Sequence, residues 1–316
     1  MKTTAILMAT LLGCGGSSGG AGDDAVDASA GQDTSSQVDA PVASARTIFT
    51  IVLENHDYAE IVGSADAPYL NSLIAQGALA TNYSDTIHPS LGNYLYMISG
   101  ANQYPGIVDI SPTQTPFFPA DQPHLGTQLQ AAGIKWRAYM ESMGIPCNLS
   151  NAGKYAPKHN PFVYFVDLQS DPNGVCAQTN VDYSEFAADL ATNEYRFMWI
   201  TPNLDSDGHD PGSNPVLGLQ QSDLWMSQEV PKILASAGFQ NGGILFVTWD
   251  EAEGRDGNDG DKIPMIVLSP RVKMAGMTSS TAMNHGAYLA TVEDQLGLPR
   301  LATVATSPTL IEFLSP

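Results

Sequence analysis

Short apolar runs that end abruptly in polar residues are the feature that most limits the folds open to this chain. Four such runs have the length of buried strands, and several of their residues are β-branched. They cover residues 47–53, 197–201, 243–249 and 263–269. Uninterrupted apolar runs are typical of parallel strands that are covered on both faces of a sheet. The runs therefore predict buried parallel strands.

Helical patterns lie between these runs. They cover residues 67–76, 91–99, 124–132, 223–237 and 285–296, and glycines follow or end four of them as plausible C-caps: Gly77, Gly100, Gly133 and Gly238. Strand and helix thus alternate, which predicts an α/β fold with a mostly parallel sheet between two layers of helices. Functional sites of such folds lie at the carboxyl ends of the strands.

The first 14 residues have the pattern of a signal peptide. Lys2 precedes an apolar run that is too short to span a bilayer, and the run ends in Leu-Leu-Gly-Cys. That ending resembles a lipobox, in which Cys14 becomes the lipid-modified first residue of the mature protein. We therefore expect an exported chain that is lipid-anchored in the cell envelope; ordinary cleavage and secretion is the alternative.

Residues 15–45 have the composition of a disordered linker. They contain five acidic side chains, no basic ones and hardly any large apolar residue. From residue 46 to residue 316 the chain is apolar and aromatic throughout, which predicts one catalytic domain. This domain contains Cys147 and Cys176, and an even pair in an exported chain predicts a disulfide; free buried thiols are the alternative.

The formal charge of the chain is -20 at pH 7. A charge of this sign argues against nucleic acid as a partner, because nucleic-acid binding depends on neutralising phosphates with Lys and Arg. A phosphate ester could be attracted only by a local cation and by backbone N–H groups.

Two of the predicted strands deliver acidic and amide side chains at their carboxyl ends. Glu54 and Asn55 follow the strand at 47–53, and Asp250 and Glu251 follow the strand at 243–249. Each pair alone is more typical of a solvated turn. On one parallel sheet the four side chains are expected to meet, and their oxygens suit one divalent cation.

Ser90 lies at the predicted start of the helix at 91–99, where a serine commonly acts as an N-cap. The same place suits a nucleophile that accepts a phosphoryl group, because the helix dipole is positive there. His88, His209 and His285 all fall near predicted strand ends. Converging histidines could serve a leaving group and charged phosphoryl oxygens.

Several separated motifs, taken in order, resemble the bacterial phosphoesterase family of acid phosphatases, phosphatidylinositol-3-phosphatase-like enzymes and phospholipases C. The motifs are Glu-Asn-His-Asp-Tyr from Glu54, His-Pro-Ser-Leu-Gly-Asn-Tyr from His88, Pro-Asn through Gly-His-Asp from Pro202, and Thr-Trp-Asp-Glu from Thr248. Lys158-His159-Asn160-Pro161 and the segment that begins at His285 agree as well. The resemblance extends from about residue 46 to about residue 301.

The resemblance implies an alkaline-phosphatase-like α/β/α sandwich and a hydrolase with one divalent metal. The implied metal ligands are Glu54, Asn55, Ser90, Asp250 and Glu251. In such a mechanism the metal lowers the pKa of the Ser90 hydroxyl, a phosphoserine forms, and water releases phosphate. The implied contacts to the phosphoryl oxygens come from the three histidines named above.

The loop after Glu251 separates the members of this family. Phospholipase C members continue with a Gly-Gly and a downstream Asp-His, whereas this chain has no histidine there. We therefore predict an acid phosphatase that acts as a monomer on small or phosphoinositide-borne phosphate monoesters. A phospholipase C-type phosphodiesterase is the alternative, and a non-catalytic surface lipoprotein is a remote one. We assign Asn93 and His159 to substrate binding. Lys158, His159 and Asn160 could line the substrate pocket, or could instead pack near the disulfide.

Overall fold

The computed structural model describes residues 46–101, 108–114, 122–209, 217–253 and 261–316. The signal peptide, Cys14 and the linker predicted at 15–45 lie outside these ranges and stay predictions. Within the described ranges, no helix is long and apolar enough to cross a membrane.

A central sheet of eight strands organises the described residues. Its order is β5-β4-β6-β1-β7-β8-β2-β9. The strands are β1 Ile48–Leu53, β2 Ala78–Ala80, β4 Trp136–Met140, β5 Asn180–Asp182, β6 Phe197–Thr201, β7 Ile244–Trp249, β8 Met265–Leu268 and β9 Met277–Ser279. A separate pair is formed by β3 Tyr83–Ser84 and β10 Met283–Asn284.

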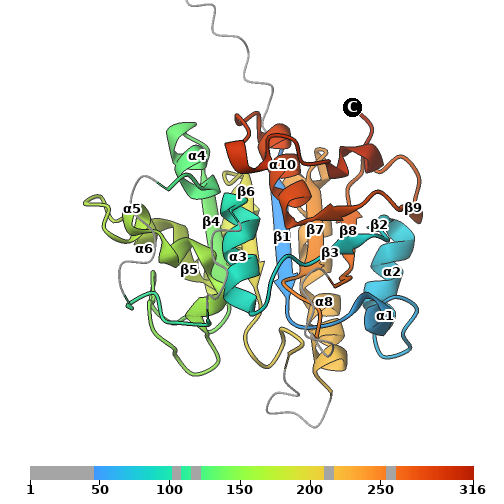
Figure 1. The fold of residues 1–316 in the computed structure, drawn as a ribbon, viewed down its shortest axis with the longest axis horizontal. Coiled ribbons are helices and arrows are strands. Elements are labelled where there is room, and N and C mark those ends of the chain that lie inside the picture. The colour runs from blue at the N-terminus through green and yellow to red at the C-terminus, as the bar shows by residue number, and fades with distance from the viewer. Residues whose placement is uncertain (1–45, 102–107, 115–121, 210–216, 254–260) are drawn as a thin grey trace, which may run out of the picture. The chain divides into compact units, whose positions relative to one another are not determined.

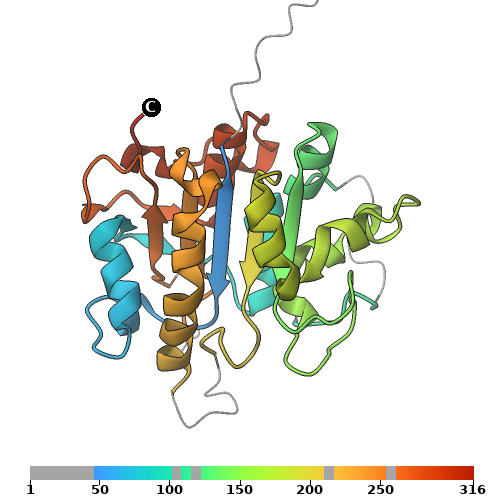
Figure 2. The same cartoon turned by 180° about the vertical axis from the view of Figure 1, so that it is seen from behind.

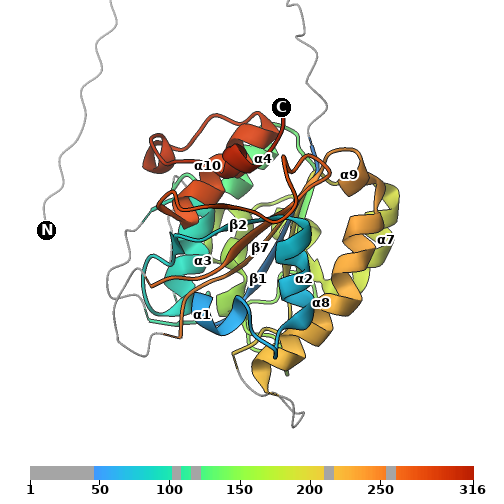
Figure 3. The same cartoon turned by 90° about the vertical axis from the view of Figure 1, so that its right-hand side faces the viewer.

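Two layers of helices cover this sheet, as Figures 1, 2 and 3 show from three sides. One face carries α3 Ser90–Ser99, α4 Leu125–Ala131 and α10 His285–Leu296, and the other carries α2 Pro68–Gln76, α7 Phe186–Thr192, α8 Gly218–Ala235 and α9 Ala237–Gln240. The remaining α-helices are α1 Tyr58–Ile61, α5 Val166–Gln169 and α6 Val175–Thr179. The predicted α/β/α sandwich is confirmed.

The strands at the centre of the sheet are those that the apolar runs predict most closely. Every residue of β1 and of β7 is buried, because the strands lie between helices on both faces. β1 pairs in parallel with β6 on one side and with β7 on the other. Their carboxyl ends consequently meet at one edge of the sheet.

The direction predicted for the run at 263–269 is wrong. β8 pairs antiparallel with β7, with Thr248 opposite Met265. The chain that leaves β7 returns directly along the same strand, and a direct return forces the antiparallel direction.

Two helix boundaries also differ from the prediction. α8 begins at Gly218 instead of residue 223 and ends at Ala235. Gly238 does not cap that helix but lies within α9, which begins after Ser236, whose hydroxyl accepts the Phe239 N–H at 3.2 Å. Gly100 does end α3, with a left-handed φ of 62° that suits glycine.

A disulfide joins Cys147 to Cys176, with a Cα–Cα distance of 5.4 Å. Cys147 lies in the loop that follows β4, and Cys176 lies in α6. The pairing agrees with the prediction from the cysteine count.

Candidate active site

The carboxyl ends of β1 and β7 bring the two predicted acidic pairs together. Leu53 lies opposite Trp249 at the last position of the parallel register, so the residues that follow each strand are neighbours. The Asn55 backbone N–H donates to Asp250 Oδ1 at 3.3 Å, and its Nδ2 donates to Glu251 Oε1 at 3.2 Å. Asn55 has a φ of 42°, in a left-handed region that asparagine tolerates.

Ser90 faces these carboxylates from the opposite side of the site. It is the first residue of α3 and is buried, and its Oγ lies 3.2 Å from Glu54 Oε2 and 3.2 Å from Glu251 Oε1. The N-cap position belongs to Pro89, and no side chain caps this helix. The Ser90 hydroxyl therefore does not act as an N-cap, and it points at the acidic residues that follow β1 and β7.

Burial makes this cluster of carboxylates electrostatically costly. Glu54, Asp207, Asp250 and Glu251 are all buried. Burial raises the pKa of Glu54 well above its usual value, Asp207 raises it further, and Lys158 acts in the opposite direction. Burial also raises the pKa of Asp250, with Glu54 and Glu251 adding to the effect.

Two buried oxygens of the site have no hydrogen-bond partner, and this arrangement suits a bound cation. Asn55 Oδ1 and Asp250 Oδ2 are buried and accept no hydrogen bond. A divalent cation prefers carboxylate, amide and hydroxyl oxygens, and the residues present fit one. In the described parts of the chain, no group of three or more His, Cys, Asp or Glu side chains is already arranged as a metal site. The amide of Asn55 and the hydroxyl of Ser90 would have to complete the ligand set.

A second layer of side chains lies against Glu54. The Tyr94 hydroxyl donates to Glu54 Oε1 at 2.6 Å, and His159 Nε2 lies 3.3 Å from the same oxygen. The rings of Tyr94 and His159 stack with centroids 5.4 Å apart, and His159 Nδ1 lies 3.7 Å from Asp207 Oδ2. Burial lowers the pKa of His159 well below its usual value. Burial therefore favours the neutral form of this ring.

His88 pairs with the carboxylate of Glu251. Its Nδ1 lies 2.9 Å from Glu251 Oε2, and its Nε2 lies 3.4 Å from Asp85 Oδ2. The hydrogen bond to Glu251 outweighs burial and raises the pKa of His88 to about 9. Asp85 also accepts the backbone N–H groups of Ala252 at 3.1 Å and Asp261 at 3.0 Å. Asp85 thereby holds both His88 and the residues that flank the loop after Glu251.

His285 is engaged through both ring nitrogens. Its Nε2 lies 2.7 Å from the Asp250 backbone oxygen, and its Nδ1 lies 3.1 Å from the Tyr83 hydroxyl. The geometry requires that Nε2 carries the proton, since a carbonyl can only accept. Burial lowers the pKa of His285 to about 4. In this arrangement His285 positions Asp250, and the phosphoryl contact predicted for it stays a prediction.

Asn93 serves the structure through both ends of its amide. Its Oδ1 accepts the Thr86 N–H at 3.0 Å and the Ile87 N–H at 3.2 Å, and its Nδ2 donates to the Ile87 oxygen and to Glu251 Oε2. Asn93 thus ties the segment before Ser90 to the carboxylate of Glu251. The substrate contact predicted for Asn93 stays a prediction.

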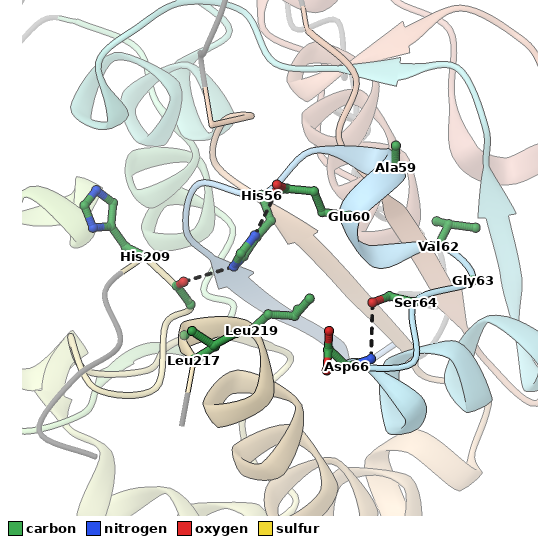
Figure 4. A pocket seen from close by; sticks show the side chains of 12 residues that line it. His56, Ala59, Glu60, Val62, Gly63, Ser64, Asp66, His209, Leu217 and Leu219 are labelled. Atoms are coloured by element: carbon green, nitrogen blue, oxygen red, sulfur yellow. Dashed lines mark hydrogen bonds and ion pairs between the residues drawn. The ribbon is translucent and has the colours of Figure 1, made fainter. Parts of the chain in front are cut away.

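His209 is exposed at the rim of the site, between two cavities. The first, of about 590 Å³, is lined by His56, Glu60 and Leu219 among others, and the second, of about 450 Å³, is lined by Lys158 and His159 among others; His209 lines both. In Figure 4, His56 lies between Glu60 and the backbone of Gly208, and the His209 ring turns away from Leu217 and Leu219.

Three residues of this site were not predicted from the sequence. Asp207 lies beside His159, Tyr94 donates to Glu54, and Asp109 accepts the backbone N–H of Leu91, next to Ser90. Lys158, which was predicted to line the substrate pocket or to pack near the disulfide, forms an ion pair with Asp109. Tyr94 follows Ser90 by four positions, so helical spacing places it one turn along the same face. Asp207 lies in the polar loop after β6, as a predicted strand-end site requires. No sequence signal pairs Lys158 with Asp109.

Comparison with known proteins identifies relatives of this chain. A family model described as the Phosphoesterase family matches residues 63–299. A phosphatidylinositol-3-phosphatase of Mycobacterium tuberculosis is 29% identical over 272 residues, which cover 84% of this chain and 82% of the relative. A probable acid phosphatase of Kluyveromyces lactis is 26% identical, with coverage of 86% of this chain and 63% of the fungal relative. The chain thus spans less than two thirds of that relative.

A solved structure shows the same fold. It is a protein of the alkaline phosphatase superfamily from Vibrio parahaemolyticus, with a TM-score of 0.60 and 14% sequence identity. The match covers 85% of this chain and 70% of that one. The alkaline-phosphatase-like architecture is therefore confirmed.

Proposed function

The chain belongs to the Phosphoesterase family and hydrolyses phosphoric esters, and from this premise we propose that it is a phosphomonoesterase that forms a phosphoserine at Ser90. The observation that carries the proposal is the position of Ser90 Oγ, 3.2 Å from carboxylate oxygens of both Glu54 and Glu251. Such a hydroxyl, buried at the positive end of a ten-residue helix, suits attack on a phosphoryl group.

The residues that would hold a divalent cation are Glu54, Asn55, Ser90, Asp250 and Glu251. Such a cation, when bound, would supply positive charge that lowers the pKa of the Ser90 hydroxyl and offsets the charge of the phosphate. The partnerless oxygens of Asn55 and Asp250 support its presence.

In the first chemical step, Ser90 Oγ bonds to phosphorus while the bond from phosphorus to the substrate alcohol breaks. The hydroxyl proton of Ser90 leaves to the surrounding carboxylates, and the departing alcohol takes up a proton. We assign that donation to His209, which is exposed at the rim. In the second step water adds to phosphorus, inorganic phosphate leaves, and the Ser90 hydroxyl is restored.

The buried residues around Ser90 orient these groups. Tyr94 donates a hydrogen bond to Glu54 and His159 lies beside it, while His88 and Asn93 contact Glu251. Because each ligand carboxylate has fixed partners, the oxygens need little rearrangement when a phosphate arrives.

The substrates that we propose are phosphate monoesters, either small or borne on a phosphoinositide head group. The names of the bacterial and fungal relatives, a phosphatidylinositol-3-phosphatase and an acid phosphatase, support this class. We further propose that the chain is exported and lipid-anchored through Cys14, and that it works as a monomer. A phospholipase C-type diesterase is the alternative in the same fold.

The test is hydrolysis of an aryl phosphate by the purified protein, together with detection of a phosphorylated serine after acid quenching. We expect Ser90→Ala to abolish both signals, and chelation to remove activity that added divalent ions restore. Ser99→Ala is the matched control, because Ser99 is a buried serine of the same helix whose hydroxyl donates only to the Leu95 oxygen. Full activity in Ser90→Ala contradicts the mechanism.

Product analysis separates the two kinds of ester. Inorganic phosphate released from a monoester supports the proposal. Release of diacylglycerol from phosphatidylcholine, without phosphate release from monoesters, supports the phospholipase C-type alternative.

A further inference from the structure

The carboxylate of Asp109 lies at the start of α3, next to Ser90. Asp109 Oδ1 accepts the Leu91 backbone N–H at 3.1 Å, and Asp109 Oδ2 lies 2.7 Å from Lys158 Nζ. Leu91 directly follows the proposed nucleophile in α3. The carboxylate therefore bridges one backbone donor at the start of the helix and one ammonium group.

These two donors are of the kind that a phosphoryl group on Ser90 requires. A phosphate offers several anionic oxygens, and backbone N–H groups at a helix N-terminus and lysine ammonium groups are common partners for them. Asp109 has the same sign of charge and the same acceptor chemistry. Asp109 thus accepts from the same two donors, the Leu91 N–H and Lys158 Nζ, that an oxygen of the substrate phosphate would use.

The charge balance of the site is a further reason to regard Lys158 as a phosphate ligand. The site contains four buried carboxylates, two of which contact Ser90, and a phosphate monoester adds more negative charge. Of the described residues that line the two cavities beside the site, Lys158 is the one Lys or Arg. It lies next in sequence to His159, which contacts Glu54.

A purely structural role explains the Lys158–Asp109 pair poorly. The two side chains are 27% and 28% exposed, and ion pairs that water can reach contribute little to folding stability. The second cavity, which both residues line, also gives a ligand access to them.

We propose that Lys158 and the Leu91 N–H bind the phosphoryl group of the substrate, and that Asp109 is an internal competitor that gives up both donors when the substrate enters. The inference rests on the proposed function and deepens it. Lys158 is then a residue that determines phosphate affinity, and Asp109 sets how strongly phosphate must compete.

The test measures the affinity of inorganic phosphate by titration calorimetry on the full chain, without turnover. We expect Lys158→Met to weaken phosphate binding about 10- to 100-fold, as loss of a charge-assisted hydrogen bond implies. We expect Lys158→Arg to retain most of the affinity. Asp109→Asn removes the competing charge, and we expect it to tighten phosphate binding several-fold.

Lys154→Met is the matched control. Lys154 forms an ion pair with Asp205 at 2.7 Å, so this variant makes the same change of net charge in a neighbouring pair. We expect its phosphate affinity to stay within twofold of that of the parent protein. An equal loss in Lys154→Met would assign the effect to the overall field and overturn the inference.

The inference predicts opposite effects on phosphate affinity: Lys158→Met weakens phosphate binding and Asp109→Asn tightens it. If the pair only holds the loop in place, Lys158→Met and Asp109→Asn both weaken binding, and that result refutes the inference. Because Asp109→Asn keeps an acceptor oxygen for Leu91, it provides a decisive measurement even if Lys158→Met does not fold. Failure of the proposed function appears separately, as aryl phosphate hydrolysis that survives in Ser90→Ala.

Discussion

The buried neutral ring of His285 predicts a measurable link between pH and stability. Its pKa is about 4 in the folded protein, against an ordinary value of 6.5, because burial disfavours the charged ring. Between these two values the unfolded chain binds more protons than the folded chain does. The stabilising contribution of the neutral ring is therefore complete above pH 6.5 and is lost progressively as pH falls from 6.5 to about 4.

The size of this contribution follows from the shift. A difference of roughly 2.5 pKa units corresponds to about 3 kcal/mol in the free energy of unfolding, at 1.36 kcal/mol per unit. About 2 kcal/mol of it should be gone by pH 5. In His285→Gln, whose amide can still donate to the Asp250 oxygen, this part of the pH dependence should be absent.

The assay is urea unfolding of the parent protein and of His285→Gln from pH 8 to pH 5, in the presence of a chelator. The carboxylates titrate in both proteins, so the difference between the two curves isolates His285 to first order. Tyr83→Phe should give an intermediate slope, because it removes the hydroxyl that donates to the neutral ring. Parallel stability curves for the parent protein and His285→Gln would refute the reasoning.

Three further predictions concern other contacts. Tyr94→Phe should lower the free energy of unfolding by about 1–3 kcal/mol and reduce kcat/KM, because buried Glu54 loses its 2.6 Å donor. Urea unfolding and initial rates check both effects, and an unchanged kcat/KM would contradict this role of Tyr94. Replacing Cys147 and Cys176 by Ser should lower the free energy of unfolding by about 3–4 kcal/mol, since the bridge closes a separation of 29 residues. The reference is the oxidised parent protein, and an unchanged midpoint of urea unfolding would contradict a disulfide in solution. Asn93→Leu should reduce kcat more than it raises KM, because Asn93 positions Glu251; steady-state kinetics test this, and a change in KM alone would favour direct substrate contact.

The central strands could be predicted from the sequence because their environment leaves a local signature. β1 and β7 are buried along their whole length, so both appear as unbroken apolar runs, and the predicted boundaries differ from the observed ones by one residue. β4 was missed, because Arg137 interrupts its pattern. The direction of β8 was wrong, because the strand with which a segment pairs is not encoded in its own composition.

The residues at the strand ends could likewise be predicted, since parallel strands deliver their carboxyl ends to one edge. The sequence by itself determined that Glu54, Asn55, Asp250 and Glu251 would be neighbours on such a sheet. It left open whether Ser90 was a helix cap, and the answer came only from the position of its hydroxyl between two carboxylates.

Only the tertiary structure decided what the remaining polar residues do. Nothing in the local sequence shows that Asp109 contacts both Leu91 and Lys158. The same is true of His285, whose two ring nitrogens contact Tyr83 and Asp250. The physical reason is that a charge or a hydrogen bond acquires its strength from burial and from partners distant in sequence. The sequence determined which chemical groups arrive at the site, and the folded chain decided which of them are held in fixed contacts and which remain for a substrate.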